Sequence, residues 1–100
     1  MAWMVKKGTK NIDQFFTIKE SDGTVKNVSG YTVRINARRG STPLFSGVLT
    51  VASGTTGYTY YTILSGDLSY ATRADYEIVL EKGDELIPTE TYPLQIGRRV

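Results

Sequence analysis

FFTIKESDGTVKNVSGYTVRI, residues 15–35, combines two strand patterns and two turn signals in one continuous stretch. Ser21-Asp22-Gly23 is the first turn signal, because Asp bonds to its own downstream backbone and Gly adopts a positive φ without steric penalty. Ser29-Gly30 is the second. The residues after it alternate between apolar and polar, with Tyr31, Val33, Ile35 and Ala37 on one face and Thr32, Arg34, Asn36 and Arg38 on the other. This period of two predicts a strand with one buried and one solvated face.

Short runs of the same kind continue along the chain. We expect strands over residues 1–7, where an arm is the alternative, and then over 12–19, 31–38, 44–52, 58–64 and 75–81, with a last strand through Tyr92, Leu94 and Ile96. Gly and Pro in residues 40–43 and Gly in residues 53–57 predict loops, and Pro88 and Pro93 predict an edge or broken last strand. About seven short strands without helical periodicity predict an all-β fold, an immunoglobulin-like antiparallel β-sandwich.

The alternating runs also predict the core. The apolar faces contain Phe16, Ile18, Val33, Ile35, Leu49, Ile63, Ile78 and Leu80. Phe15 faces away from that core, and Asp75, Glu77, Val79 and Glu81 are expected to face water. A chain of 100 residues has room for one such core, so we expect a single domain over residues 1–100.

Composition excludes several classes of function. The chain has no Cys and no His, which removes disulfides, thiolate chemistry and the commonest general base and metal ligand. The net charge of +2 is small, and the pairs Lys6-Lys7, Arg38-Arg39 and Arg98-Arg99 are dispersed, so no nucleic-acid partner is expected. Charged Lys6 interrupts the N-terminus before a secretory apolar region develops, and no apolar run reaches membrane-spanning length. We therefore expect synthesis in the cytoplasm and no membrane contact.

The acidic residues do not form a catalytic pattern. Most of them lie beside Gly or in turns, where carboxylates are ordinarily structural or solvated. Gly54-Thr55-Thr56-Gly57 lacks the Lys-Ser/Thr of a phosphate-binding loop, and only Asp84-Glu85 come together as possible calcium ligands. We expect no enzyme activity, no catalytic residues, no metal site and no cofactor.

Aromatic residues are the candidates for a binding surface. Tyr58 and Tyr60 share one face of their strand and Tyr61 the other, so one set is expected in the core and the other exposed. Sheet packing, a protein interface and a sugar-stacking platform are three uses for such a group. The interface candidates are Trp3, Phe15, Tyr58 and Tyr60, with the segment around Trp3 as a possible arm.

The chain also resembles a known family. The Phe-rich strand, the Ser-Asp-Gly turn, the Val25-to-Gly30 connector and the strand that starts at Tyr31 are similar to the N-terminal domain of phage baseplate upper proteins and related tail proteins. YTILSGD at residues 61–67 and ADYEIVL at residues 74–80 resemble the second half of that domain. The matches extend from about Val5 to the C-terminus. The chain departs from the family where Arg73-Ala74-Asp75 stands in place of a common Pro-Gly.

The resemblance implies a non-enzymatic structural module of a phage tail or baseplate. Such a module docks onto a neighbouring tail protein, positions the host-binding apparatus and resides in the virion; a homo-oligomer is a further possibility. A different class of function fits the same sandwich, namely a carbohydrate-binding or adhesin domain that contacts the host surface directly.

Overall fold

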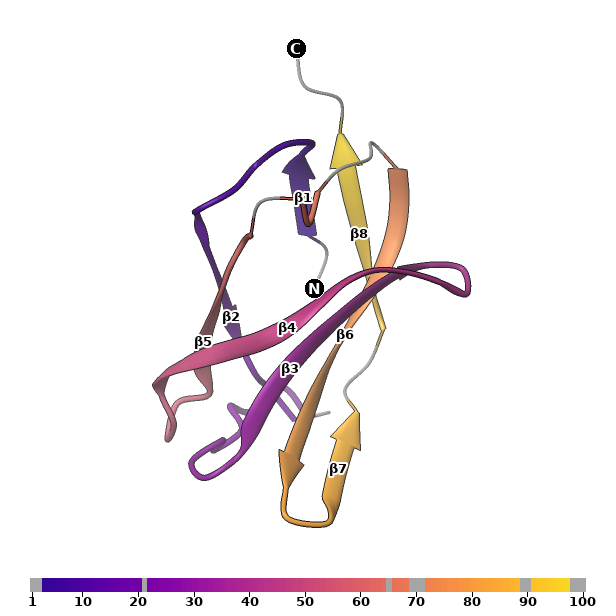
Figure 1. Cartoon of the computed structure of the whole chain (residues 1–100). Helices are drawn as coiled ribbons and strands as arrows, with labels where there is room; N and C mark the ends of the chain where they lie inside the picture. The colour runs from indigo at the N-terminus through magenta and orange to yellow at the C-terminus, as the bar shows by residue number, and fades with distance from the viewer. Residues whose placement is uncertain (1–2, 21, 65, 69–71, 89–90, 98–100) are drawn as a thin grey trace.

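β-Strands dominate the computed structural model of the chain, which describes residues 3–20, 22–64, 66–68, 72–88 and 91–97 (Figure 1). Its eight strands are β1 (Trp3–Lys6), β2 (Asp13–Thr17), β3 (Thr32–Arg39), β4 (Thr42–Ser53), β5 (Tyr58–Thr62), β6 (Thr72–Lys82), β7 (Glu85–Pro88) and β8 (Tyr92–Gly97). No helix occurs within these described residues. Of the residues singled out from the sequence, Ser21, Ser65, Arg98 and Arg99 lie outside them.

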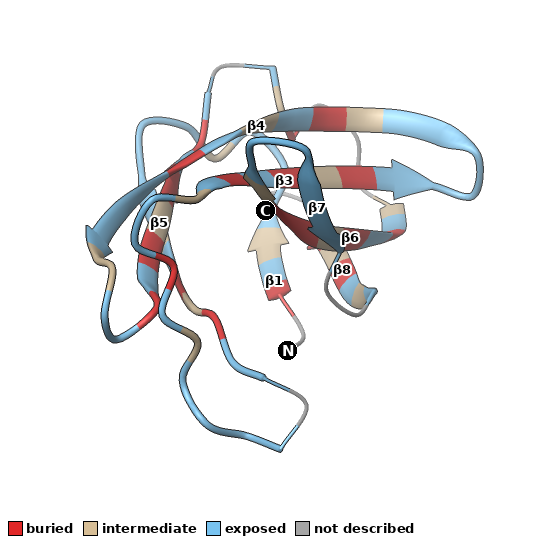
Figure 2. Cartoon of the chain, turned by 90° about the horizontal axis from the view of Figure 1, so that it is seen from below, coloured by how far each residue is buried: buried red, intermediate tan, exposed pale blue. Residues whose placement is uncertain are grey.

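The strands form one curled sheet in the order β1-β8-β6-β3-β4-β5-β2, and β7 pairs with β6. The long strand β4 connects its two parts, because Thr42–Leu49 pair with β3 and Thr50–Ser53 pair with β5. Figure 2, an end-on view, shows the strands following an arc around β1. The all-β, sandwich-like class is confirmed. The structure differs from a purely antiparallel sandwich because β1 runs parallel to β8.

The core fills the inside of this arc. All eight residues that the alternating pattern predicts for it are buried, namely Phe16, Ile18, Val33, Ile35, Leu49, Ile63, Ile78 and Leu80. Trp3, Val28, Ala37, Phe45, Tyr61, Leu68, Ala74, Tyr76, Leu94 and Ile96 complete the cluster. The inner face of nearly every strand contributes at least one side chain, so the curled sheet encloses one continuous core.

Trp3 occupies the centre of that core. Its indole meets Phe16, Tyr76 and Phe45 edge to face, with ring centroids 5.7, 5.8 and 6.1 Å away. Since β1 and β2 are the two ends of the strand order, the contact with Phe16 joins opposite ends of the sheet. Trp3, named from the sequence as an interface candidate on a possible arm, is instead part of β1 and 4% exposed, because burying its large ring inside the curl removes apolar surface from water.

The turn at Asp22-Gly23 forms as predicted. Gly23 has a φ of 89°, and the backbone amide and hydroxyl of Thr24 both donate to Asp22 Oδ1, at 2.9 and 2.7 Å. These hydrogen bonds favour the charged carboxylate and hold the pKa of Asp22 below its ordinary value. The chain then returns beside residues 18–20, with Lys19 opposite Val25, and carries Val28 into the core.

Two local expectations are corrected. Val79 is buried and not wet, because β6 runs between β3 and β7 and places it between Arg34 and Pro88. The loop expected over residues 40–43 is only a two-residue turn, and Pro43 belongs to β4 opposite Arg38. This stretch of β4 has a neighbour on one side alone, where a missing backbone N–H is tolerated. Of the expected edge or broken last strand, the break is found at Pro88, where β7 ends, whereas Pro93 belongs to β8, which lies between β1 and β6 and not at an edge.

Truncation of the central core residues tests which face of each strand is buried. Ile35→Ala and Ile78→Ala each remove a fully buried side chain from adjacent strands and should cost about 2–5 kcal/mol of unfolding free energy. The measurement is denaturant unfolding. Val48→Ala, on the exposed face of β4, is the control and should change stability by no more than about 0.5 kcal/mol. Equal effects at the three positions would contradict this assignment.

A second prediction compares two glycines with positive φ. A Cβ at Gly57 would lie 2.6 Å from the carbonyl oxygen of Ile18 and 2.7 Å from that of Lys26, whereas one at Gly23 meets no atom within 4 Å. Gly23→Ala should therefore cost only the left-handed conformation, about 1–2 kcal/mol. Gly57→Ala adds a clash with two backbone carbonyl oxygens. It should therefore lower the melting temperature clearly more than Gly23→Ala does. A smaller loss for Gly57→Ala would show that the connection between residues 18 and 26 is misplaced.

Candidate interaction surface

Three of the four aromatic candidates come together on the outer face of β2 and β5. The ring of Phe15 stacks on that of Tyr58 with centroids 5.1 Å apart and planes at 16°, and it lies 5.2 Å from the ring of Tyr60. Phe15 and Tyr58 are each 42% exposed, and Tyr60 is half-buried. We call Phe15, Tyr58 and Tyr60 the aromatic cluster.

The pairing of the two strands brings these rings together. Phe15 lies opposite Tyr60, and Thr17 opposite Tyr58, so side chains from both strands share one face. The next residue along each strand faces inward: Phe16 is buried opposite Thr59, whose hydroxyl donates to the Phe16 carbonyl at 3.1 Å. The prediction that Tyr58 and Tyr60 face one way and Tyr61 the other is confirmed.

Tyr61 anchors β5 beneath the aromatic cluster. Its ring stacks on Phe45 at 5.7 Å and lies over Gly47, where a Cβ would approach within 2.5 Å of the ring. Its hydroxyl donates to Asp67 Oδ2 at 2.6 Å, and the Leu64 amide donates to the same oxygen at 2.8 Å. Burial, followed by the Asp67 carboxylate, raises the pKa of Tyr61 far above its ordinary value. The cluster is therefore mounted on a strand held by packing and by a side-chain hydrogen bond.

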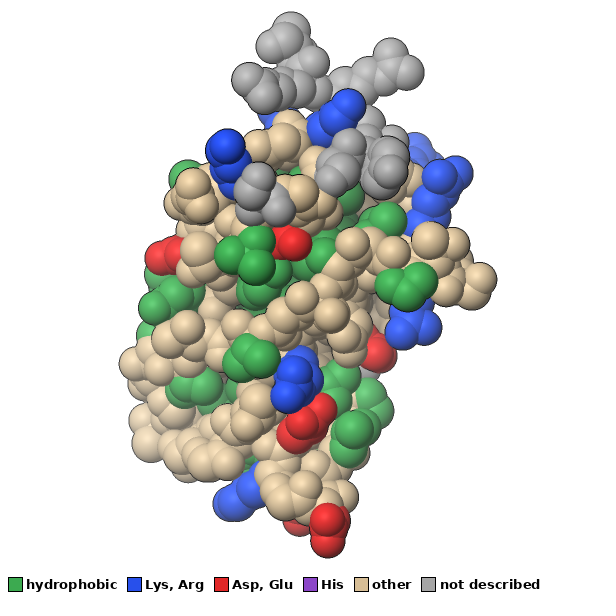
Figure 3. All heavy atoms as spheres, viewed as in Figure 1, with side chains coloured by type: hydrophobic (Ala, Val, Ile, Leu, Met, Phe, Trp, Pro, Cys, Tyr) green, Lys and Arg blue, Asp and Glu red, His purple; other side chains and the backbone are tan. Residues whose placement is uncertain are grey.

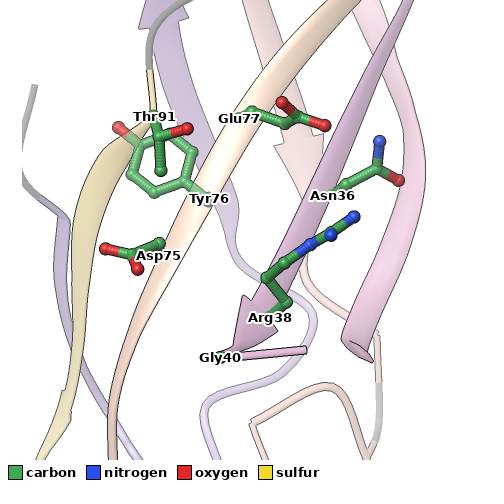
Figure 4. Close-up of a pocket in the computed structure, with 7 residues that line it drawn as sticks. All are labelled: Asn36, Arg38, Gly40, Asp75, Tyr76, Glu77 and Thr91. Carbon is green, nitrogen blue, oxygen red and sulfur yellow. The ribbon is translucent and has the colours of Figure 1, made fainter. Parts of the chain in front are cut away.

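A polar hollow of about 140 Å³ lies elsewhere, on β3 and β6. Figure 4 shows its lining residues, Asn36, Arg38, Gly40, Asp75, Tyr76, Glu77 and Thr91. Register brings them together, since Asn36 pairs with Glu77 and Arg38 with Asp75. Sequence reasoning placed Asn36, Arg38, Asp75 and Glu77 on wet strand faces but missed the hollow, because only the pairing of β3 with β6 reveals it.

The hollow is lined by acidic, basic, polar and aromatic side chains. Over the described ranges, no group of three or more His, Cys, Asp or Glu side chains could hold a metal ion. The carboxylates of Asp75 and Glu77 come from one strand and line the hollow together with Arg38.

The rest of the surface carries dispersed charge. Figure 3 shows acidic, basic and apolar side chains interspersed on one face. Two ion pairs connect them, Lys26 with Glu20 at 3.6 Å and Arg34 with Glu81 at 3.2 Å. Within the part of the chain that the structure describes, no helix is long and apolar enough to cross a membrane.

The buried tyrosines predict alkaline sensitivity. Burial, and then the nearby Tyr92, raise the pKa of Tyr76 to about 12 from an ordinary value of about 10. The folded state holds the proton of the Tyr76 hydroxyl more tightly than the unfolded state does. The resulting contribution to the free energy of unfolding is therefore complete below about pH 10 and is lost as the pH rises towards 12. Melting temperatures should fall across that interval, and Tyr76→Phe should flatten the fall.

Val33→Ala is the control for this measurement, since it weakens the same core without removing an ionisable group. It should lower the melting temperature at every pH and leave the alkaline slope unchanged. An equal slope in Tyr76→Phe and the unmodified protein would contradict the assignment.

Comparisons with known proteins find similar folds among solved structures. No family model matches the chain, and no curated protein matches it. Among solved structures, the N-terminal domain of phage TP901-1 ORF48 is similar, with a TM-score of 0.70 and 15% sequence identity over 95% of this chain and 84% of that chain. At this identity the likeness establishes the fold.

Proposed function

We propose that this domain is a non-enzymatic structural module of a phage tail or baseplate, which docks onto a neighbouring tail protein and positions the host-binding apparatus. Two likenesses support the proposal. The fold is similar to a domain of a phage protein over nearly the whole chain. Independently, residues 15–35, 61–67 and 74–80 resemble the N-terminal domain of phage baseplate upper proteins. On this proposal the protein resides in the virion tail.

The aromatic cluster is the observation that carries the docking role. Phe15 and Tyr58 keep 42% of their surfaces exposed although the core has buried Trp3, Phe16, Phe45, Tyr61 and Tyr76. Large, rigid aromatic side chains dominate the energetics of protein contacts, and burying them against a partner removes apolar surface from water. The cluster is therefore the surface that we assign to a protein partner.

A sugar-binding role is less consistent with the same geometry. Carbohydrate stacking uses an open aromatic ring face, yet Phe15 and Tyr58 lie nearly parallel and occupy one face of each other. A glycan array separates the two roles, because a recognition module should bind at least one glycan and an assembly module none.

The test of docking is the double variant Phe15→Ser/Tyr60→Ser, mixed with purified candidate tail proteins and followed by light scattering. The unmodified domain should form a complex, and the variant should weaken it by about 10-fold or more, since two hot-spot aromatics are lost. Met4→Ser is the control, because Met4 is highly exposed on β1, away from the cluster.

A melt of each variant completes the experiment. Both should keep a cooperative transition, since the substituted side chains are at least partly exposed. Full binding by the double variant would remove the cluster from the proposed interface. Loss of the fold in the double variant would instead show that these rings are part of the structural core.

A further inference from the structure

Four stretches of the sheet have a neighbouring strand on one side only among the described residues. They are β1, β2, β7 and the Thr42–Leu49 part of β4. A free strand edge presents unpaired backbone N–H and C=O groups, and proteins usually protect it with proline, lysine or a bulge. The four edges differ in whether they have this protection.

Three of them are protected. β7 ends in Pro88, which lacks an N–H. The β4 stretch contains Pro43 and a register shift opposite Ala37 and Arg38. β1 is four residues long and ends at Lys6, which Lys7 follows. β2 has five residues, Asp13–Thr17, and contains neither proline, lysine nor a bulge.

The hydrogen bonds of β2 show which groups its free edge offers. The Ile18 amide donates to the Gly57 carbonyl, and the Ile63 amide donates to the Ile12 carbonyl. The backbone N–H and C=O groups of the even-numbered residues of this strand therefore point toward β5. The amides and carbonyls of Asp13, Phe15 and Thr17 consequently project from the other side. One of these carbonyls, that of Phe15, accepts a long bond of 3.3 Å from its neighbour Gln14.

The Asp22 turn leaves this edge open. Lys26 donates to the Ile18 carbonyl, and the Glu20 amide donates to Thr24. Both bonds use backbone groups of the even-numbered residues Ile18 and Glu20, which point to the same side as β5. The returning segment therefore lies on the β5 side of this part of the chain. It does not pair with Asp13, Phe15 or Thr17.

We propose that β2 pairs antiparallel with β2 of a second copy of this chain, about a two-fold axis through Phe15. Each of the three edge residues then donates and accepts one backbone hydrogen bond, and the two sheets become continuous. The inference is independent of the proposed function, because it uses the backbone edge and leaves the outer face of the aromatic cluster open.

Self-complementarity of the edge favours a second copy over an unrelated strand. In this register Asp13 lies opposite Thr17 of the other copy, a pairing like that within the chain, where the Thr62 hydroxyl donates to Asp13 at 2.7 Å. Lys19 lies diagonally from Asp13 of the other copy, so opposite charges approach. Phe15 lies opposite Phe15 of the other copy, so the two aromatic clusters lie side by side and their outer faces stay open.

Sedimentation equilibrium over a range of protein concentrations tests the proposal with Thr17→Pro and Thr17→Val. Proline removes the edge N–H without removing a bond to β5, so Thr17→Pro should raise the dimer dissociation constant by on the order of 10-fold, since two symmetry-related bonds are lost. Thr17→Val keeps the N–H and should still dimerise. A monomer at every concentration of the unmodified protein, or unchanged self-association in folded Thr17→Pro, would overturn the proposal.

Hydrogen exchange of the unmodified protein decides the matter if Thr17→Pro does not fold. The amides of Phe15 and Thr17 should become protected as concentration rises through the dimer transition, while that of Met4 on the β1 edge should not. Unprotected Phe15 and Thr17 amides in the dimer would overturn the proposal. Loss of self-association in Thr17→Pro with retained binding to a tail protein would separate this inference from the docking role.

Discussion

The packing of Trp3 against Phe16 is the contact on which the architecture depends. These side chains come from β1 and β2, the two ends of the strand order, and no backbone pairing connects those strands. The indole also meets Tyr76 and Phe45 edge to face, so strands from every part of the sheet converge on one ring system. Its Nε1 is buried without a hydrogen-bond partner among the described residues, which indicates that apolar packing outweighs the cost of one unsatisfied donor.

Closure by side chains, and not by hydrogen bonds, has a consequence for the surface. A barrel that closes through its backbone has no edges, whereas this sheet keeps the edges of β1 and β2 unpaired. The curl also separates two outer surfaces of different chemistry. Aromatic rings gather over β2 and β5, and a polar hollow forms over β3 and β6. A partner that recognises one of these surfaces need not cover the other.

The aromatic cluster and the β2 edge lie side by side, since Phe15 belongs to both. Its side chain points to the outer face, while its backbone amide and carbonyl point along the sheet. One residue therefore offers apolar area to a partner that covers the face and hydrogen bonds to a partner that extends the sheet. Tyr61, held by Phe45 and Asp67, keeps the supporting strand β5 in place beneath both.

The sequence alone determined what depends on neighbouring residues. Alternation identified Val33 and Ile35 as core and Phe15 as outward, and it placed Tyr58 and Tyr60 on the face opposite Tyr61. Asp22-Gly23 identified its turn, because side-chain direction and turn conformation follow from local backbone geometry. Only the tertiary structure decided that Trp3 fills the core, that Val79 is covered beside Pro88, and that Asn36 and Arg38 face Glu77 and Asp75. These facts depend on which strands become neighbours in the sheet. The burial of apolar area across the whole chain determines that pairing, and a local sequence pattern does not predict it.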